Sequence, residues 1–189
     1  MLQEHLTKEG ILKLVEIKSA MNKGLPINLK EAFPNAVHME RPEYTFKDIP
    51  DPYWVAGFTS GDGSFGVKTA SSPTTKLGSR VQLRFSIGLN IREMELIKGL
   101  ATFFNLNKEA HDKYVYIKND SVHLQLIKQS DILDIIIPFF LKYPIDGIKA
   151  LDFSDFKQVA DLLKNKEHLT PEGFNKILAI KARMNKARD

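Results

Sequence analysis

A single carboxylate stands where a helix is expected to end. In residues 51–65 (DPYWVAGFTSGDGSF), Asp51 can cap a helix, Pro52 suits its first turn, and Gly63 is a common stop signal. Asp62 then lies at the C-terminal end, where the helix macrodipole is already negative, so its charge costs a few tenths to about 1 kcal/mol without a nearby cation. A hard divalent ion would offset that charge and could also bind the free carbonyl oxygens of the last turn. For an isolated Gly-Asp-Gly segment, a solvated turn before a strand explains the same residues.

Four small residues recur along the same helix. The pairs Ala56/Ser60 and Gly57/Gly61 are each four positions apart, so they are expected on one face. A stripe of small side chains lets a second helix approach almost backbone to backbone, as is best documented in membranes. The stripe therefore predicts an interface between two such helices.

The segments that follow alternate between apolar and polar side chains. Residues 64–72 are expected to start a strand, with Phe65 and Val67 on one face and Gly66 and Lys68 on the other. Residues 80–88 form a second strand that places four polar side chains on one face: Arg80, Gln82, Arg84 and Ser86. A solvated face would explain one such strand. Residues 64–92, however, contain five basic residues and no acidic one, and Arg and Gln read base edges in the major groove, so DNA contact is the favoured interpretation.

A second pair of strands is predicted at 113–118 and 121–127, joined by a two-residue turn at Asn119 and Asp120. Its second strand sends three apolar side chains inward and three polar ones outward: Val122, Leu124 and Leu126 against Ser121, His123 and Gln125. The sequence does not fix the face that Tyr116 and Lys118 occupy. Tyr116, Lys118, His123 and Gln125 complete the set of candidate DNA contacts.

Helices are predicted at 91–104, at 130–140 and at 151–164, the second of them broken around Pro138 and Pro144. The order is therefore a helix, two strands, a helix, two strands and two or three helices. Such an order is typical of an α+β fold with a four-stranded antiparallel sheet, one face of which is buried against helices.

Two distant segments repeat one another. Residues 5–24 (HLTKEGILKLVEIKSAMNKG) return as 168–187 (HLTPEGFNKILAIKARMNKA), with 11 of 20 positions identical. Each copy reads as a helix capped by a threonine, Thr7 or Thr170. The spacing suggests duplication of a whole unit, of which only the second copy is complete in this chain. We expect residues 1–24 to be the tail of a preceding repeat, 25–50 a linker and 51–189 a complete unit.

Residues 55–63 (VAGFTSGDG) resemble the nine-residue signature of the LAGLIDADG homing endonucleases, and Trp54 before them and Ser64-Phe65 after them fit that family as well. The usual mid-motif aspartate is replaced here by Ser60. The resemblance covers essentially the whole sequence. It implies a LAGLIDADG half-domain of order α-β-β-α-β-β-α, whose four-stranded sheet forms a saddle for duplex DNA, and the C-terminal half of a two-repeat, single-chain type.

The resemblance also implies an activity and a site. Members of the family hydrolyse both DNA strands at a long recognition site with Mg²⁺, for which Ca²⁺ or Mn²⁺ can substitute. By this resemblance, Asp62 supplies a carboxylate and Gly61 a backbone carbonyl oxygen to the metal. The family's basic residue near the scissile phosphate is matched to Lys149, which would stabilise developing charge. A surface lysine beside a turn explains Lys149 equally well, and the sequence does not separate the two.

The chain has one motif and one such acid, whereas the family's active site needs two. Either two copies pair through Ala56, Gly57, Ser60 and Gly61, or the chain is the C-terminal half of a longer enzyme. The leftover helix at 5–24 favours the second origin. The expected partners are therefore double-stranded DNA and a second copy or a missing N-terminal half.

Composition excludes several other classes of function. The absence of cysteine excludes disulfides, thiolate zinc sites and cysteine nucleophiles. The longest apolar run, 135–141, is far too short to span a bilayer, and no secretory signal peptide is evident. We expect an intracellular protein that uses neither a membrane nor a small-molecule substrate, and the family resemblance implies a mitochondrial, intron-encoded one. The alternatives are a non-cleaving nucleic-acid binder, such as a maturase-like RNA splicing cofactor, and a helical interaction module without nucleic acid.

Overall fold

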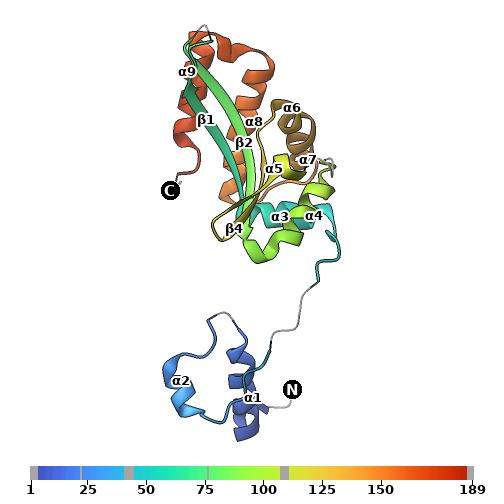
Figure 1. Cartoon of the computed structure of the whole chain (residues 1–189). Helices are drawn as coiled ribbons and strands as arrows, with labels where there is room; N and C mark the ends of the chain where they lie inside the picture. The colour runs from blue at the N-terminus through green and yellow to red at the C-terminus, as the bar shows by residue number, and fades with distance from the viewer. Residues whose placement is uncertain (1–3, 22, 41–44, 76, 107–110, 187–189) are drawn as a thin grey trace. The chain divides into compact units, whose positions relative to one another are not determined.

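The computed structural model describes residues 4–21, 23–40, 45–75, 77–106 and 111–186, apart from the side chains of residues 111 and 112. The chain forms two compact units, unit 1 (residues 1–45) and unit 2 (residues 46–189), and each is described by itself. In its described part, unit 1 has the helices α1 (Lys8–Ser19) and α2 (Ile27–Ala32), and unit 2 has the sheet (Figure 1). No helix in the described ranges is long and apolar enough to cross a membrane.

Unit 2 has the predicted α+β order of elements, with a short extra helical turn, α5, before the second hairpin. Along the chain its elements are α3 (Pro52–Asp62), β1 (Gly63–Ser71), β2 (Ser79–Asn90), α4 (Met94–Phe103), α5 (His111–Tyr114), β3 (Val115–Lys118), β4 (Ser121–Leu126), α6 (Gln129–Asp131), a π-helical turn (Ile132–Ile136), α7 (Ile137–Lys142), α8 (Ile148–Lys164) and α9 (Pro171–Arg183). A 3₁₀ turn precedes α4 at Ile91–Glu93 and another precedes α9 at Glu167–Leu169.

The four strands form one antiparallel sheet in the order β1-β2-β4-β3, as the fold prediction requires. Alternate side chains point to opposite faces of a strand, and the buried ones all lie on one face. Phe65, Phe85 and Leu126 are paired across three neighbouring strands, and each is fully buried. The polar side chains between them lie on the other face, which the helices leave open.

The buried face packs against the helices through an aromatic cluster around Phe65. Its ring centroid lies 5.3 Å from those of Phe85 on β2 and of Phe153 and Phe156 on α8. Burial of each such ring stabilises the fold by roughly 1.5–3 kcal/mol relative to exposure. In Figure 1, α8 and α9 run alongside the long strands β1 and β2, while α3 and α4 lie at one end of the sheet. This packing fixes the end of α3 relative to the sheet.

The predicted break at Pro138 is wrong. The helix that begins at Gln129 continues through Pro138 and ends at Lys142, two residues before Pro144. A π-helical turn at Ile132–Ile136 ends two residues before Pro138. A π turn widens the helix and shifts its hydrogen bonds, so a residue without an N–H group can be accommodated. The sequence showed the proline but not this widening.

The two repeated segments fold in the same way locally. In α1 the Thr7 hydroxyl accepts a hydrogen bond from the Gly10 N–H at 2.9 Å, and in α9 the Thr170 hydroxyl accepts one from the Gly173 N–H at 3.1 Å. A 3₁₀ turn precedes each cap, at Glu4–Leu6 and Glu167–Leu169. The predicted threonine caps of both helices are confirmed, and each satisfies a free N–H group of the first turn.

Candidate active site

Asp62 is the last residue of α3 and is exposed where that helix turns directly into β1. The predicted cap is present at the other end of the helix, where the Asp51 carboxylate accepts a hydrogen bond from the Trp54 N–H at 2.9 Å. Gly63 is required at the turn, because a Cβ there would lie 2.4 Å from the Thr59 methyl carbon and 2.7 Å from its carbonyl oxygen. The glycine therefore sets the point at which the helix ends and the carboxylate is presented.

Lys149 reaches this helix end from the first turn of α8. Its ammonium group donates hydrogen bonds to the carbonyl oxygens of Gly61, at 3.0 Å, and of Gly63. These carbonyls lie at the negative end of the α3 dipole, which a cation stabilises. The structure thus brings three of the predicted site residues together: Asp62, Gly61 and Lys149. Their roles in metal binding and catalysis stay predictions.

The hydroxyl group of Ser60 makes a further connection between α3 and the segment before α8. It donates a hydrogen bond to the Ala56 carbonyl oxygen at 3.0 Å and accepts one from the Asp146 N–H at 3.3 Å. Asp146 precedes Lys149 by three residues, so this bond helps to hold the lysine beside the helix end. The sequence placed Ser60 in the family signature and at a predicted helix interface, but did not indicate this contact with the segment before α8.

The predicted small-residue interface is corrected at Ala56. Its side chain is only 2% exposed and belongs to the core of unit 2, so it cannot face a second helix. Gly57 and Gly61 are exposed, and a Cβ on either would have nothing within 4 Å. Successive residues of an α-helix are 100° apart, so the i,i+4 rows of Ala56 and Gly57 lie side by side and can differ in burial. The outward stripe is therefore Gly57 and Gly61.

The oxygen donors at the end of α3 are of the kind that a hard divalent cation prefers. An exposed carboxylate and a helix-end carbonyl, those of Asp62 and Gly61, suit Mg²⁺ or Ca²⁺. In the described part of the chain, no group of three or more His, Asp or Glu side chains could hold a metal ion. The remaining ligands would have to come from water, from DNA phosphate or from a second helix end.

The predicted DNA contacts lie on the open face of the sheet. In the register of β1 and β2, Lys68 pairs with Gln82 and Gly66 with Arg84, which places these polar side chains on one face. Ser86 pairs with Gln125 on β4. Arg80 continues the same face of β2 by alternation. None of the residues in the four described strands is acidic.

Strand pairing also settles the face of Tyr116 and Lys118. Tyr116 on β3 pairs with His123, and Lys118 pairs with Ser121, so both belong to the open face. The rings of Tyr116 and His123 stack with centroids 5.0 Å apart. Sequence alone did not decide this point, because the short strand β3 has no buried face with which to fix its register.

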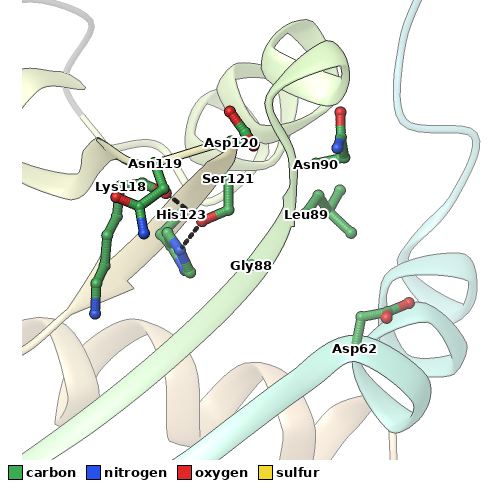
Figure 2. A pocket seen from close by; sticks show the side chains of 9 residues that line it. All are labelled: Asp62, Gly88, Leu89, Asn90, Lys118, Asn119, Asp120, Ser121 and His123. Atoms are coloured by element: carbon green, nitrogen blue, oxygen red, sulfur yellow. Dashed lines mark hydrogen bonds between the residues drawn. The ribbon is translucent and has the colours of Figure 1, made fainter.

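A hollow of about 700 Å³ connects the acid with the second hairpin. Figure 2 shows its lining, which comes from the end of α3, the end of β2 and the β3–β4 turn: Asp62, Gly88, Leu89, Asn90, Lys118, Asn119, Asp120, Ser121 and His123. The candidate metal ligand and part of the open face therefore border one open space.

A basic residue that sequence reasoning missed lies at the other end of the sheet. Lys181 on α9 donates a hydrogen bond to the Thr69 hydroxyl on β1 at 2.7 Å. With Lys68 and Arg80 it lines a second hollow at this edge. The repeat could have drawn attention to this residue, because Lys181 and Lys18 are identical at matching positions of the two copies.

Known proteins resemble this chain over nearly its whole length. The family model described as LAGLIDADG endonuclease matches residues 55–160. A Neurospora crassa protein named as a probable intron-encoded endonuclease 3 is 39% identical over 180 residues, which are 95% of this chain and 33% of that protein. The crystal structure of the LAGLIDADG meganuclease I-CpaMI bound to uncleaved DNA is 54% identical with a TM-score of 0.91, and the match covers 97% of this chain and 62% of that one.

A structure of I-SmaMI bound to an uncleaved DNA target in the presence of calcium ions is also similar, with 40% identity and a TM-score of 0.89 over 98% of this chain and 62% of that one. The chain thus spans about a third of the curated relative and about three fifths of the two solved chains. The family model covers more than half of the chain and includes the helix that ends at Asp62. This chain belongs to the LAGLIDADG endonuclease family.

Proposed function

We propose that this chain is the C-terminal half of a site-specific, metal-dependent endonuclease that cuts both strands of duplex DNA. One observation carries the proposal: the exposed Asp62 carboxylate, the Gly61 carbonyl and the Lys149 ammonium converge at one end of a sheet with a cationic open face. A carboxylate has no use in phosphate binding by itself, because it repels phosphate. Its presence beside a cationic sheet face favours a nuclease over a simple binder such as a maturase-like cofactor.

In this proposal, Asp62 and the Gly61 carbonyl hold a divalent ion, with Mg²⁺ as the physiological metal and Ca²⁺ or Mn²⁺ as substitutes. The bound metal would lower the pKa of a water molecule and neutralise charge on the leaving oxygen. Lys149 is within reach of the same carbonyl and would stabilise the charge that develops on the scissile phosphate. The similar I-SmaMI structure holds its uncleaved DNA target in the presence of calcium ions, which supports a metal of this hard class.

The open face is proposed to bind the DNA major groove. Arg84 and Gln82 carry the side chains that pair bidentately with guanine and adenine, while Lys68 and Arg80 are suited to phosphates. Both similar structures are described as bound to DNA, which supports DNA as the partner here. Binding that relies on such phosphate contacts weakens steeply with salt.

The second catalytic acid is proposed to come from a preceding half-domain. In α9 and directly after it, Ile177, Ile180 and Met184 are buried in unit 2, at 0%, 8% and 5% exposure. The repeat places Leu14, Ile17 and Met21 at the matching positions of α1 and the segment after it, and there they are 52%, 40% and 51% exposed. The exposed apolar side chains of α1 are explained if they pack, as those of α9 do, against a half-domain that is not part of this sequence.

Hydrogen bonding supports the same assignment. Lys181 on α9 bonds to Thr69 on β1, whereas its counterpart Lys18 bonds to the carbonyl oxygen of Gly24 within unit 1. The exposed stripe of Gly57 and Gly61 would then receive the motif helix of the preceding half. Pairing of two copies through the same stripe is the alternative. The name of the relative, an intron-encoded endonuclease, supports an intron-encoded gene product, and we propose the mitochondrion as its place of action.

The experiment that tests the proposal is cleavage of a randomised duplex library by the purified chain with Mg²⁺, beside Asp62→Asn, with the mass of the chain measured in solution. Double-strand breaks at one palindromic site, lost in Asp62→Asn, would establish a nuclease assembled from two copies. If the chain alone binds DNA in a salt-sensitive way but does not cut it, and the reconstituted two-repeat protein does cut it, the chain is the C-terminal half of a longer enzyme. Absence of DNA binding, or cleavage that Asp62→Asn leaves unchanged, would overturn the proposal.

A further inference from the structure

His123 on the open face is held by contacts with its neighbours on β3 and β4. Its ring stacks on Tyr116 with the two ring planes 13° apart, and its Nε2 lies 2.8 Å from the Ser121 hydroxyl oxygen. Tyr116 is held in turn, because its hydroxyl accepts a hydrogen bond from the Gln125 amide at 3.2 Å. These contacts connect β3 and β4 across the open face and leave the imidazole little freedom.

On its other side, His123 lies over Gly88 of the central strand β2. A Cβ on Gly88 would lie 2.5 Å from the His123 Nδ1 and 2.7 Å from its Cε1, closer than such atoms can approach. Gly88 is not among the described glycines with a positive φ, so its backbone does not require glycine. Glycine inside a strand is unfavourable by roughly 0.5–1 kcal/mol relative to alanine and often marks a close approach. The close neighbour here is the imidazole.

A second glycine of the open face provides the comparison. Gly66 pairs with Arg84 in the neighbouring strand, but a Cβ there would be 3.8 Å from the guanidinium nitrogens, an ordinary contact. The clearance at Gly88 is therefore specific to His123.

The hydrogen bonds around Ser121 also fix which imidazole nitrogen is the acceptor. The Ser121 hydroxyl has one proton, and it donates that proton to the Lys118 carbonyl oxygen at 2.7 Å. The same hydroxyl oxygen must then accept from His123, so Nε2 carries the proton of the neutral ring. Nδ1, on the side of Gly88, is left as the acceptor.

The position of this ring gives it a use. His123 and Gly88 border the same hollow as Asp62 (Figure 2). In the proposed complex, a duplex whose scissile phosphate lies at Asp62 would extend along this hollow and bring an adjoining base pair towards His123. An acceptor nitrogen in the major groove suits the exocyclic amino groups of adenine and cytosine. A side chain that is already immobilised loses less entropy on binding than a mobile one.

We propose that His123 reads a base next to the cut, accepting a hydrogen bond from an adenine or cytosine amino group, and that Gly88 is the positioning residue that leaves room for it. This inference rests on the proposed function, since it requires the open face to bind duplex DNA near Asp62. The inference therefore assigns the recognition of one base position next to the cut to His123 and Gly88.

The test is a double-mutant cycle read out as base preference. Duplexes that bind the chain are selected from a randomised library and sequenced for the parent, Gly88→Ala, His123→Ala and the double variant, with Gly66→Ala as the matched control. Selection by binding needs no cleavage. Thermal unfolding of each variant shows that it is folded, and the atoms that a Cβ at Gly88 would displace belong to a side chain and not to the backbone.

We expect Gly88→Ala and His123→Ala to reduce the preference for adenine or cytosine at the same position, by about five- to tenfold, the equivalent of one hydrogen bond. Gly88→Ala should have no further effect once His123 is removed, and Gly66→Ala should leave that position unchanged. The inference is overturned if Gly88→Ala acts equally with and without His123, or if no single position changes while the parent still selects DNA. Failure of the parent to select any duplex would instead remove the proposed function, and the inference with it.

Discussion

The ammonium nitrogen of Lys149 lies 3.0 Å from the carbonyl oxygen of Gly61, 88 residues earlier in the sequence. This carbonyl is the one proposed to bind metal beside Asp62, so the lysine and the metal would share one helix end. Both are cations and both offset the negative end of the α3 dipole. We therefore propose that the lysine stabilises the helix end in the absence of metal and would lie beside the reacting phosphate if a metal binds there.

Replacement of Lys149 by methionine, of similar length but without charge, should separate these two effects. We expect a loss of a few tenths to about 1 kcal/mol in the free energy of unfolding, as for a cation at a helix C-terminus. The single-turnover cleavage rate should fall about 10²-fold, since a charge stabilising the transition state is removed. Lys149→Arg should restore part of the rate. An unchanged rate at saturating DNA would assign Lys149 a structural role only.

Gly57 and Gly63, six residues apart, should respond in opposite ways to a side chain. Gly63→Ala should destabilise unit 2 by about 1–3 kcal/mol, because its Cβ would meet the buried Thr59. Gly57→Leu should leave unit 2 as stable or more stable, since the site is open and glycine is a poor helix former. The same Gly57→Leu change should abolish pairing with a second motif helix. Denaturant unfolding measures the change in stability, and sedimentation measures the pairing. Intact pairing in Gly57→Leu would show that the stripe of Gly57 and Gly61 is not the interface between the two helices.

Lys68 should contribute to DNA binding through charge. We expect Lys68→Ala to weaken binding similarly for all sequences and to reduce the slope of log K against log salt by about one. The matched control is Lys164→Ala, which removes the same charge from the exposed C-terminal end of α8. Binding titrations at several salt concentrations give the slopes. Equal slopes for Lys68→Ala and the control would remove Lys68 from the interface.

The repeat allows one substitution to be compared in two environments. Ile177→Ala should destabilise unit 2 by about 2–5 kcal/mol, because the side chain is fully buried. Leu14→Ala, at the matching position of α1, should change stability by no more than about 0.5 kcal/mol in this chain. In the two-repeat protein, Leu14→Ala should become as costly as Ile177→Ala. If it stays neutral there, α1 does not pack as α9 does.

Tyr114 should make stability depend on pH in the alkaline range. Burial and the hydrogen bond to the adjacent Asp131 carboxylate, at 2.9 Å, raise the pKa of Tyr114 above its ordinary value of 10.0. Because the folded state holds the phenol proton more tightly, this contribution is complete below pH 10 and is lost as pH rises through the raised pKa. Tyr114→Phe should therefore cost about 1.5–3 kcal/mol at neutral pH, the value for a hydrogen bond to a charged group. The difference should shrink above pH 10, and a constant difference in denaturant titrations would contradict this account.

Local sequence determined the elements that need only their own neighbours. Asp51 and Thr170 cap helices because their side chains reach an N–H group three residues on. The alternation around Phe85 selects a strand with one buried face, since side chains in a strand point to opposite sides in turn. The repeat at 5–24 and 168–187 and the family signature at 55–63 are likewise properties of the sequence itself.

The tertiary structure decided what depends on contacts between distant segments. Ala56 is buried because the core of unit 2 covers one side of α3. The sequence of small residues does not show which of the two adjacent rows of side chains, that of Ala56 or that of Gly57, faces the core. Tyr116 lies on the open face of the sheet because it pairs with His123. The four residues of β3 are too few for the alternation of apolar and polar side chains to fix the register of the strand. Lys149 contacts Gly61 because the aromatic cluster around Phe65 packs α8 against the sheet and the hydrogen bond from Asp146 to Ser60 holds the segment before α8. A bond across 88 residues needs the whole core to hold its two ends in place.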